Sequence, residues 1–415
     1  MISLFDVVHL DIWIYENTLR IKFSGTIKER INNIYVPINK GFKIHSVSRG
    51  MSYKPDKVEL TDFPTAINAL NIQTKLRTVE IELEGTVEPF LFEFWGSKGK
   101  YTHYLKQETI WYPFMYLKSS STSALDFATV ITKLHRKVEV NIHSSNDEYS
   151  TIVSAEPVDK NRWLGSNLEP LSLIQDKFTQ VKSDHVSNYT VHVYQKVPDD
   201  LSPDYDVPEI FSDVLSSFNK YLSLELPYKT IYLVALNGGG GFKSNNLIVI
   251  DNSIASDKRK IFTLIAHELM HEWWPKIIID EKILWMSEAI PEYIAALLTY
   301  LSGYSNNLKL DNFLNMAVKG LSAPDYHPLA SIPVSLTETE YNVMRGLGVM
   351  VLHKIAKSIG TDTFVKLIGK LSKENALTFD KLLSALNSYG VPENTLQWFT
   401  NVIEGKTKPD ANAFS

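Results

Sequence analysis

The residues best suited to chemistry in this chain are two histidines and a glutamate with the spacing H-E-x-x-H: His267, Glu268 and His271. Residues four apart on an α-helix lie on nearly the same face, so both imidazoles can bind one ion. Two imidazoles and a carboxylate, with one position left for water, form the ligand set of a catalytic zinc ion. Glu268 lies beside that face, where it can accept a proton from the water. The pattern predicts metal-assisted hydrolysis, against the alternative of a core helix whose histidines happen to share a face.

A third ligand is expected from the segment that follows. Glu288 stands among apolar residues in the phrase Leu-Trp-Met-Ser-Glu, and a carboxylate in such surroundings needs a partner such as zinc. Glu281 is the rival ligand, but it lies in a charged connection where a solvated turn is expected. Glu292, one helical turn after Glu288, is either an exposed helix residue or an acceptor that orients a ligand histidine.

Caps and apolar spacing predict the helices that carry these residues. Residues 256–274 show apolar side chains at helical spacing, with Ser256 as the expected cap and Asp257 in the first turn. Pro275 ends this helix. A second helical pattern follows over residues 288–300. Two neighbouring antiparallel helices would place a carboxylate opposite the histidines.

The stretches HELMHEWW and LWMSEAIPEYIA resemble the zinc-binding core of the alanyl/leucyl aminopeptidase family of gluzincin zinc metallopeptidases. The loop between them is two residues shorter than is usual in that family, and Ser287 and Ala289 replace the family's Asn and Gly. The chain therefore resembles a divergent member. The resemblance implies one Zn²⁺ per chain, a peptide substrate, and a general base at Glu268. It implies as metal ligands His267, His271 and Glu288.

A glycine run, Gly238, Gly239, Gly240 and Gly241, stands where the family has Gly-x-Met-Glu-Asn, an edge strand that pairs with the substrate. Four glycines would let a peptide backbone approach closely. A flexible turn is one alternative; a phosphate loop is another, but no Lys-Ser/Thr helix start follows the glycines. The family glutamate that binds the substrate amine is absent here. Glu108 is the N-terminal carboxylate nominated for that task.

An oxyanion donor is expected from the helical pattern of residues 337–358. Its sequence from Tyr341 to Leu352 is similar to the family's Tyr-Glu-Lys-Gly-x-x-Val-Leu, in which the tyrosine donates a hydrogen bond to the transition state. Alignment on Gly348 puts Arg345 at the tyrosine position and Tyr341 one turn earlier. Both residues therefore remain candidates for this role.

The periodicity of the sequence changes near its middle. Residues 1–195 alternate in the strand period in segments such as 18–23, 78–83, 138–142 and 189–194. A polar, proline-spaced segment over residues 196–206 follows, and helical patterns dominate residues 207–415. We expect an α+β protein: an N-terminal antiparallel β sandwich or saddle, a linker, and a mainly α, thermolysin-like catalytic domain of the zincin type.

Composition and charge limit the other classes of protein to which this chain could belong. The apolar share of 44% and the charged share of 21% are those of an ordinary globular protein, and 415 residues suffice for two domains. The net charge of −5 without a basic stripe argues against a nucleic-acid partner, and the absence of cysteine excludes thiolate chemistry. No apolar stretch reaches membrane-spanning length, and the N-terminus lacks a basic leader. A cytoplasmic protein without a membrane partner is expected; the oligomeric state is left open.

The favoured function is an aminopeptidase-like zinc peptidase acting on small peptides. Its rivals are an endopeptidase or processing protease, which needs no amine anchor, and a noncatalytic peptide-binding scaffold. An ester or epoxide hydrolase is a further alternative. The intact Glu268 argues against the scaffold, because binding alone has no use for a general base.

Overall fold

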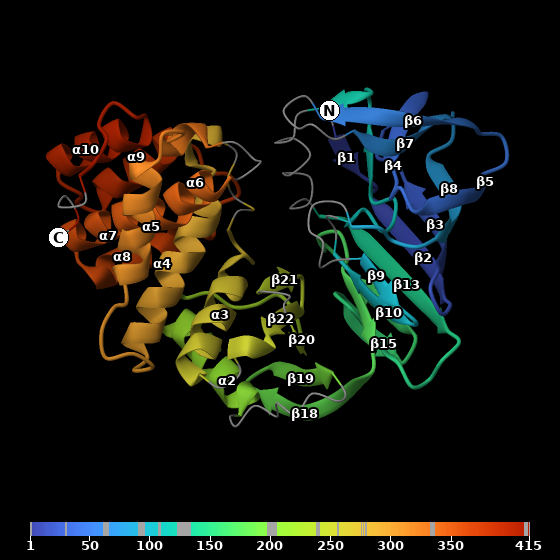
Figure 1. Ribbon diagram of the computed structural model, residues 1–415, viewed down its shortest axis with the longest axis horizontal. Helices are drawn as coiled ribbons and strands as arrows, with labels where there is room; N and C mark the ends of the chain where they lie inside the picture. Colours follow the sequence, from blue (N-terminus) through green and yellow to red (C-terminus); the bar gives the residue numbers. More distant parts are fainter. Residues whose placement is uncertain are drawn as a thin grey trace. The chain divides into compact units, whose positions relative to one another are not determined.

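The structure is a computed structural model, and the residues that it describes are 2–29, 31–60, 66–89, 96–106, 109–122, 134–196, 206–237, 241–254, 257–274, 276, 278, 280–332, 337–410 and 414. Contacts group the chain into two compact units. Unit 1 comprises residues 1–202 and 228–252, and unit 2 comprises residues 203–227 and 253–415. Strands make up unit 1 and helices make up unit 2 (Figure 1). This confirms the expected α+β class.

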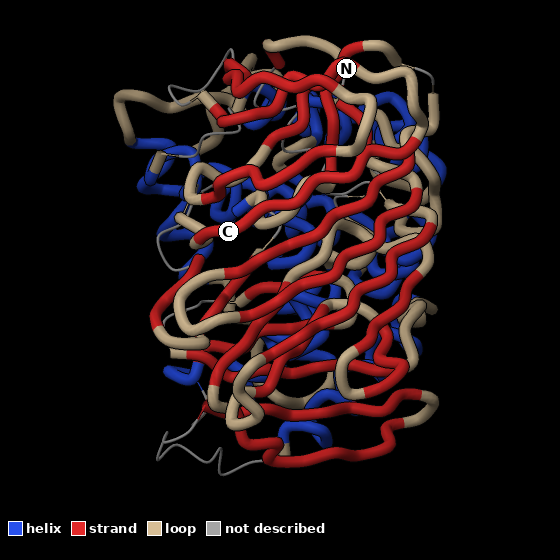
Figure 2. Tube along the Cα trace, turned by 90° about the vertical axis from the view of Figure 1, so that its right-hand side faces the viewer, coloured by secondary structure: helices blue, strands red, loops and turns tan. Residues whose placement is uncertain are grey.

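The strands of the described part of unit 1, drawn in red in Figure 2, form four sheets. A seven-stranded sheet has the order β15 (Glu156–Asp159), β16 (Arg162–Gly165), β13 (Lys137–Ser144), β2 (Val7–Ile14), β3 (Leu19–Thr26), β8 (Thr78–Gly85), β5 (Phe42–Val47). A six-stranded sheet has the order β1 (Ile2–Leu4), β11 (Met115–Leu117), β4 (Asn33–Pro37), β7 (Ile67–Gln73), β6 (Ser52–Leu60), β12 (Ser121–Thr122).

Two smaller sheets complete this set. One has the order β14 (Ser150–Val153), β17 (Leu173–Asp176), β10 (Thr102–Leu105), β9 (Gly96–Gly99). The other has the order β18 (Phe178–Val186), β19 (Tyr189–Lys196), β20 (Thr230–Leu236), β22 (Leu247–Asp251), β21 (Phe242–Ser244). Most pairs are antiparallel, although β2 and β13 pair in parallel, as do β19, β20 and β22. The four segments expected to be strands are all strands: β3, β8, β13 and β19.

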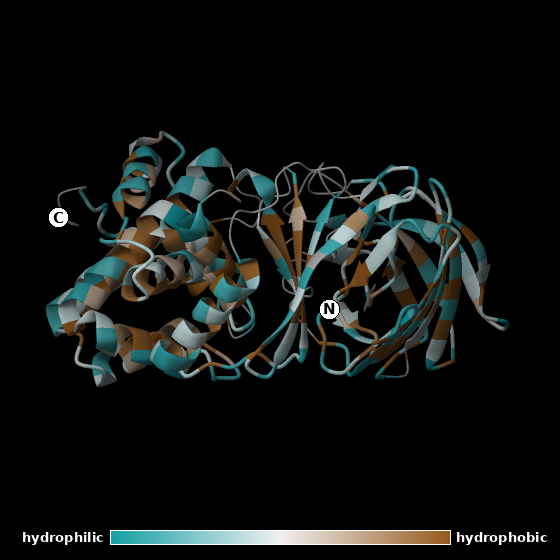
Figure 3. Cartoon of the chain, turned by 90° about the horizontal axis from the view of Figure 1, so that it is seen from below, coloured by the Kyte–Doolittle hydropathy of each residue, from teal (hydrophilic) through white to brown (hydrophobic). Residues whose placement is uncertain are grey.

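Alternation of apolar and polar residues explains these strands. Along β2, buried residues alternate with partly exposed ones, and β8 and β13 show the same pattern. Brown and teal segments alternate along the strands in Figure 3. Such strands bury one face and expose the other. One buried apolar cluster between the smaller sheets contains Tyr104, Ile152, Ile174, Phe178, Tyr232, Val234, Leu236, Phe242, Leu247 and Val249.

The unit boundary differs from the expected domain boundary. Residues 228–252 group with unit 1 because β20 pairs in parallel with β19 and so extends a sheet that starts in the N-terminal half. The expected linker, 196–206, lies almost wholly outside the described residues. The predicted division into a domain of residues 1–195, a linker of residues 196–206 and a domain of residues 207–415 stays a prediction.

Unit 2 is built mainly from helices (Figure 1). Its α-helices are α2 (Val207–Ser217), α3 (Lys258–Met270), α4 (Met286–Leu301), α5 (Asp311–Ser322), α6 (Glu338–Tyr341), α7 (Gly348–Ile359), α8 (Thr361–Leu371), α9 (Phe379–Ser388) and α10 (Glu393–Ile403). Wider π turns occur at η2 (Phe218–Leu222) and η6 (Asn342–Leu347). Short 3₁₀ turns occur at η4 (Glu281–Ile283) and η5 (Leu329–Ser331). Across the described residues, no helix is long and apolar enough to cross a membrane.

Candidate metal centre

Helix α3 carries His267 and is capped at its C-terminus by His271, and its ends differ slightly from the sequence prediction. Asp257, rather than Ser256, is its cap: the Asp257 side chain accepts a hydrogen bond of 3.1 Å from the backbone N–H of Lys260. Ser256 lies outside the described residues. Regular helix ends at Met270, and His271 is the C-cap that begins a turn through residue 274. The expected helix through residue 274 is therefore four residues too long.

Helix α4 runs antiparallel to α3 and carries the third candidate ligand. A hydrogen bond of 2.9 Å joins the hydroxyls of Thr263 and Thr299 at one end of the helix pair. At the other end, His267 lies 3.7 Å from the Glu288 carboxylate. The expected antiparallel arrangement is thus present, and α4 begins two residues before Glu288.

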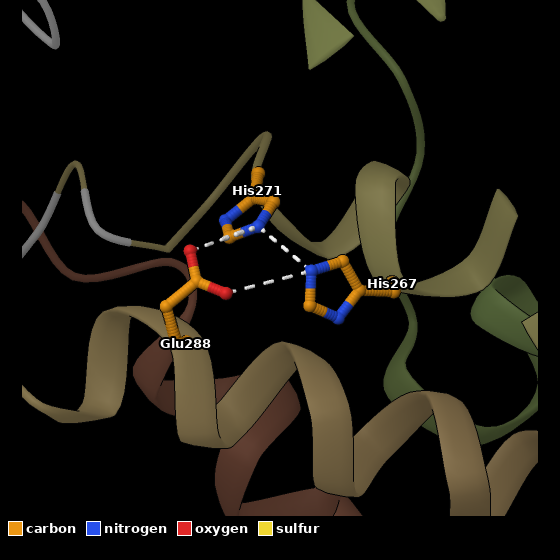
Figure 4. Close-up of side chains that lie close together, drawn as sticks. All are labelled: His267, His271 and Glu288. Carbon is orange, nitrogen blue, oxygen red and sulfur yellow. Dashed lines mark hydrogen bonds and ion pairs between the residues drawn. The ribbon is translucent and has the colours of Figure 1, made fainter. Parts of the chain in front are cut away.

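The two histidines and Glu288 point toward one another (Figure 4). The Nε2 atoms of the two histidines are 3.1 Å apart. The Glu288 oxygens lie 3.7 Å from Nε2 of His267 and 3.6 Å from Nε2 of His271. Donor atoms bound to a tetrahedral zinc ion lie about 3.4 Å from one another. The three side chains therefore have the chemistry and the separation that a zinc site needs. Glu281 is exposed and does not belong to this cluster.

The outer ring nitrogens explain why both Nε2 atoms face inward. Nδ1 of His271 lies 3.1 Å from the carbonyl oxygen of Trp274, so this nitrogen must carry the proton and donate it. Nδ1 of His267 lies 3.6 Å from the Glu292 carboxylate, just beyond hydrogen-bond length. Protons on both Nδ1 atoms leave the two Nε2 lone pairs facing each other, an arrangement that a cation between them stabilises.

Burial favours the neutral, metal-binding form of His267. The residue is 6% exposed, and its burial lowers the pKa of the imidazole, against the opposing effect of the Glu268 and Glu288 carboxylates. Glu268 is itself 5% exposed and follows His267 directly on α3. Its role as general base stays a prediction.

A charged network surrounds the cluster and was only partly anticipated from the sequence. Glu292 is 15% exposed, so it is not an exposed helix residue; its carboxylate contacts the Arg345 guanidinium as well as facing His267. Arg345 also lies 3.8 Å from Glu288 and donates a hydrogen bond to the phenolic oxygen of Tyr341. Partial burial and the Glu288 charge raise the pKa of Tyr341, which keeps the phenol protonated.

A π turn and two glycines place Tyr341 and Arg345 beside α4. The expected helix over residues 337–358 consists of α6, the π turn η6 and α7, and Arg345 lies within η6. A side chain on Gly348 would meet Ala289 and Trp285 of the α4 region at 2.8 and 2.9 Å, and one on Gly346 would meet α5. The sequence signal for this packing was the Arg-Gly-Leu-Gly spacing; the π turn itself had none.

The predicted substrate-binding residues belong to unit 1. Gly238, Gly239, Gly240 and Glu108 lie outside the described residues. Gly241 is exposed and directly precedes β21, which is the terminal strand of its sheet. The resemblance implied an edge strand at this place, and substrate pairing there stays a prediction.

Comparison with known proteins points to one class. No model of a known protein family matches the chain. Over 193 residues it is 26% identical to aminopeptidase N of the dog, and over 226 residues it is 24% identical to human endoplasmic reticulum aminopeptidase 2. These matches cover 43% and 49% of this chain but only 19% and 23% of the two relatives. The matched segment is thus a minor part of those proteins.

The fold is shared over nearly the whole chain with solved structures. An M1 zinc metallopeptidase from Deinococcus radiodurans superimposes with a TM-score of 0.66 at 13% identity, over 99% of this chain and 96% of that one. A two-domain M1 zinc metallopeptidase mutant bound to L-arginine gives a TM-score of 0.67, also at 13% identity. The fold is therefore that of an M1 zinc metallopeptidase.

The sequence matches and the shared fold together support a divergent member of the M1 aminopeptidase family. This confirms the resemblance read from the two zinc-binding stretches. The divergence lies in the shortened loop before Glu288 and in the missing amine-binding glutamate.

Proposed function

We propose that this chain is a zinc-dependent peptidase that cleaves small peptides in an aminopeptidase-like manner. The observation that carries the proposal is the convergence of His267, His271 and Glu288, with Nε2 atoms 3.1 Å apart and Glu268 buried next to His267. The similarity to M1 zinc metallopeptidases supports zinc as the ion. We propose one ion per chain.

A bound Zn²⁺ would supply Lewis acidity at the point where the three side chains meet. The Trp274 carbonyl oxygen holds Nδ1 of His271, and the Glu292 carboxylate faces Nδ1 of His267 at 3.6 Å, so both Nε2 lone pairs point to the place where the ion would bind. A carboxylate oxygen of Glu268 accepts the proton of the attacking water and passes it to the leaving amine. The base is held in a buried position before substrate arrives.

Tyr341 is the better candidate for the oxyanion donor. Arg345 already contacts two carboxylates and donates to the Tyr341 oxygen, so its own donors are engaged. The phenolic oxygen accepts from Arg345 and keeps its own proton to donate to the substrate. We assign Tyr341 the oxyanion and Arg345 the task of positioning it.

The substrate class is argued from the relatives and from the sheet edge. A mutant of the Deinococcus radiodurans enzyme is bound to a Tyr-Ser-Ala substrate. In this chain the edge strand β21, with Gly241 before it, would let a short peptide add as a further strand. No nucleic acid or membrane is needed for such a reaction.

The absent amine-binding glutamate keeps two alternatives open: an endopeptidase, and a noncatalytic peptide-binding scaffold with the same fold. The test uses a panel of aminoacyl and internally quenched peptides, together with metal analysis of the purified chain. We expect one zinc per chain, release of single residues, and loss of cleavage when the substrate amine is acetylated. Cleavage that survives acetylation would favour the endopeptidase.

The control for catalysis is Glu268→Gln, which removes the base and leaves the three ligands. We expect zinc to remain bound and turnover to fall. Full turnover in this variant, or no turnover in the zinc-loaded wild type, would contradict a peptidase mechanism through Glu268. The second result would favour the scaffold.

A further inference from the structure

A cavity of about 670 Å³ opens beside the metal centre, entirely within unit 2. Glu292, Tyr341 and Arg345 form the wall that it shares with the centre. Its remaining walls come from α3, from α4, from the segment that leads into α5, and from the first turns of α5 itself. The cavity is large enough for several peptide residues, because ligand sites of this size hold drug-sized molecules.

The length of the cavity follows from the two helices that line it. Arg259 and Thr263 both line it and stand eight and four residues before His267, so Arg259 lies about 12 Å along α3 from that ligand. An extended peptide advances about 3.4 Å per residue. A peptide whose cleaved bond lies at the metal centre would therefore reach Arg259 with about its third following residue.

The floor of the cavity is polar, but its hydroxyl groups already have hydrogen-bond partners. The hydroxyls of Thr263 and Thr299 lie 2.9 Å apart, and each also contacts a carbonyl of its own helix. Ala296 between Glu292 and Thr299 leaves space above this pair. The floor therefore provides room for a chain without demanding a particular partner.

The far end of the cavity is cationic. Arg259 is paired with Asp257 at 3.4 Å, where both side chains are more than a third exposed, so the pair is weak. Lys309 also lines the cavity, is exposed, and has no ion-pair partner within the described ranges. Asp311, in the first turn of α5, is a lining residue too, and the helix dipole there stabilises its charge.

The end of the cavity next to the metal centre carries little net charge. There Glu292 and Arg345 contact each other, so their charges largely cancel. Among the other charged residues of the lining, Arg259 and Lys309 are cations and Asp311 is an anion, so one positive charge is left over.

We propose that this cavity binds a peptide substrate on one side of the cleaved bond and that Arg259 and Lys309 bind a carboxylate of that peptide. This inference rests on the proposed peptidase function. The two cations would anchor the peptide at its carboxylate, in a chain that lacks the family glutamate for the peptide amine. The carboxylate comes either from the C-terminus of a short peptide or from an acidic side chain about three residues from the cleaved bond.

The test measures binding, so that it does not depend on turnover. Tetrapeptides with a free C-terminal carboxylate are titrated calorimetrically into the zinc-loaded Glu268→Gln protein, beside the same peptides with a C-terminal amide. Because the cationic end is half exposed, we expect the free acid to bind roughly tenfold more tightly than the amide. A third peptide, amidated but with glutamate at its last position, separates the two sources of the carboxylate.

The matched variants decide where the carboxylate binds. In Arg259→Gln/Lys309→Gln the preference for the acid should disappear, whereas Lys260→Gln, an exposed charge on the same helix that does not line the cavity, should keep it. A carboxylate bound by the metal would not respond to either change. Equal binding of acid and amide, an unchanged preference in the double variant, or no measurable binding of the acid overturns the proposal. If the wild type cleaves no peptide, the peptidase function fails, and these binding ratios still test the cavity.

Discussion

Arg345 donates a hydrogen bond to the phenolic oxygen of Tyr341, and the same guanidinium contacts the Glu292 carboxylate one helical turn from a candidate metal ligand. The arrangement links a candidate oxyanion donor to the side chain that faces His267. A single arginine therefore ties two parts of the site together.

The first prediction concerns the separate roles of Tyr341 and Arg345. Tyr341→Phe removes the hydroxyl and should lower kcat by roughly a hundredfold with little change in KM, because an oxyanion donor acts mainly in the transition state. Arg345→Lys keeps the positive charge beside Glu292 but cannot hold three groups at once, and it should lower kcat less. Steady-state kinetics on one small peptide measures both. A wild-type kcat in Tyr341→Phe would mean that another group donates the hydrogen bond to the oxyanion.

The second prediction concerns Glu292 as the acceptor that orients His267. Glu292→Ala removes that carboxylate, and zinc affinity should fall roughly tenfold or more while the stoichiometry at saturating zinc is kept. Competition with a fluorescent zinc chelator measures the affinity. Glu281→Ala is the matched control, because Glu281 is exposed and outside the metal cluster. Equal losses in both variants would show that Glu292 acts only through overall charge.

The metal cluster could be predicted from the sequence because helix geometry alone fixes which residues share a face. His267 lies in α3 and His271, one turn later, is the C-cap of that helix; the apolar neighbours of Glu288 indicated a carboxylate that needs a partner. The alternation of residues in β3, β8, β13 and β19 predicted those strands for the same reason.

The surroundings of the cluster could not be predicted, because they depend on contacts between distant segments. The bond from Arg345 to Tyr341 and the contact with Glu292 depend on the π turn η6, which has no periodic signature. The grouping of residues 228–252 with unit 1 depends on β20 pairing with β19, a long-range choice that local pattern does not record.

The third prediction concerns the pH dependence of stability and rests on His135 in unit 1. This histidine is fully buried, and burial lowers its pKa to about 4. Its Nδ1 lies 2.6 Å from the carbonyl oxygen of Phe5. Between about pH 6.5 and pH 4 the unfolded chain binds a proton at this residue and the folded chain does not, so stability falls as the pH is lowered and is constant above that range.

Urea unfolding of the wild type and of His135→Asn checks this linkage. The stability advantage of the wild type over the variant should shrink by roughly 2 kcal/mol from about pH 7.5 to about pH 5. A pH-independent difference for His135→Asn would mean that the folded protein accepts the proton as readily as the unfolded one.

The fourth prediction concerns Gly348, which lets α7 pack closely against the region of Glu288. A methyl group on Gly348 would come within 2.8 Å of Ala289 and 2.9 Å of the buried Trp285 ring. Gly348→Ala gains about 1 kcal/mol of helix propensity, but crowding in a well-packed core costs about 1 to 3 kcal/mol. We expect a net loss of about 1 kcal/mol and a lower kcat, because η6 and its Tyr341 and Arg345 would shift. Thermal unfolding and steady-state kinetics of Gly348→Ala measure both effects. The control is Lys357→Ala, an exposed position on the same helix. A more stable, fully active Gly348→Ala would show that α4 and α7 can separate without disturbing the site.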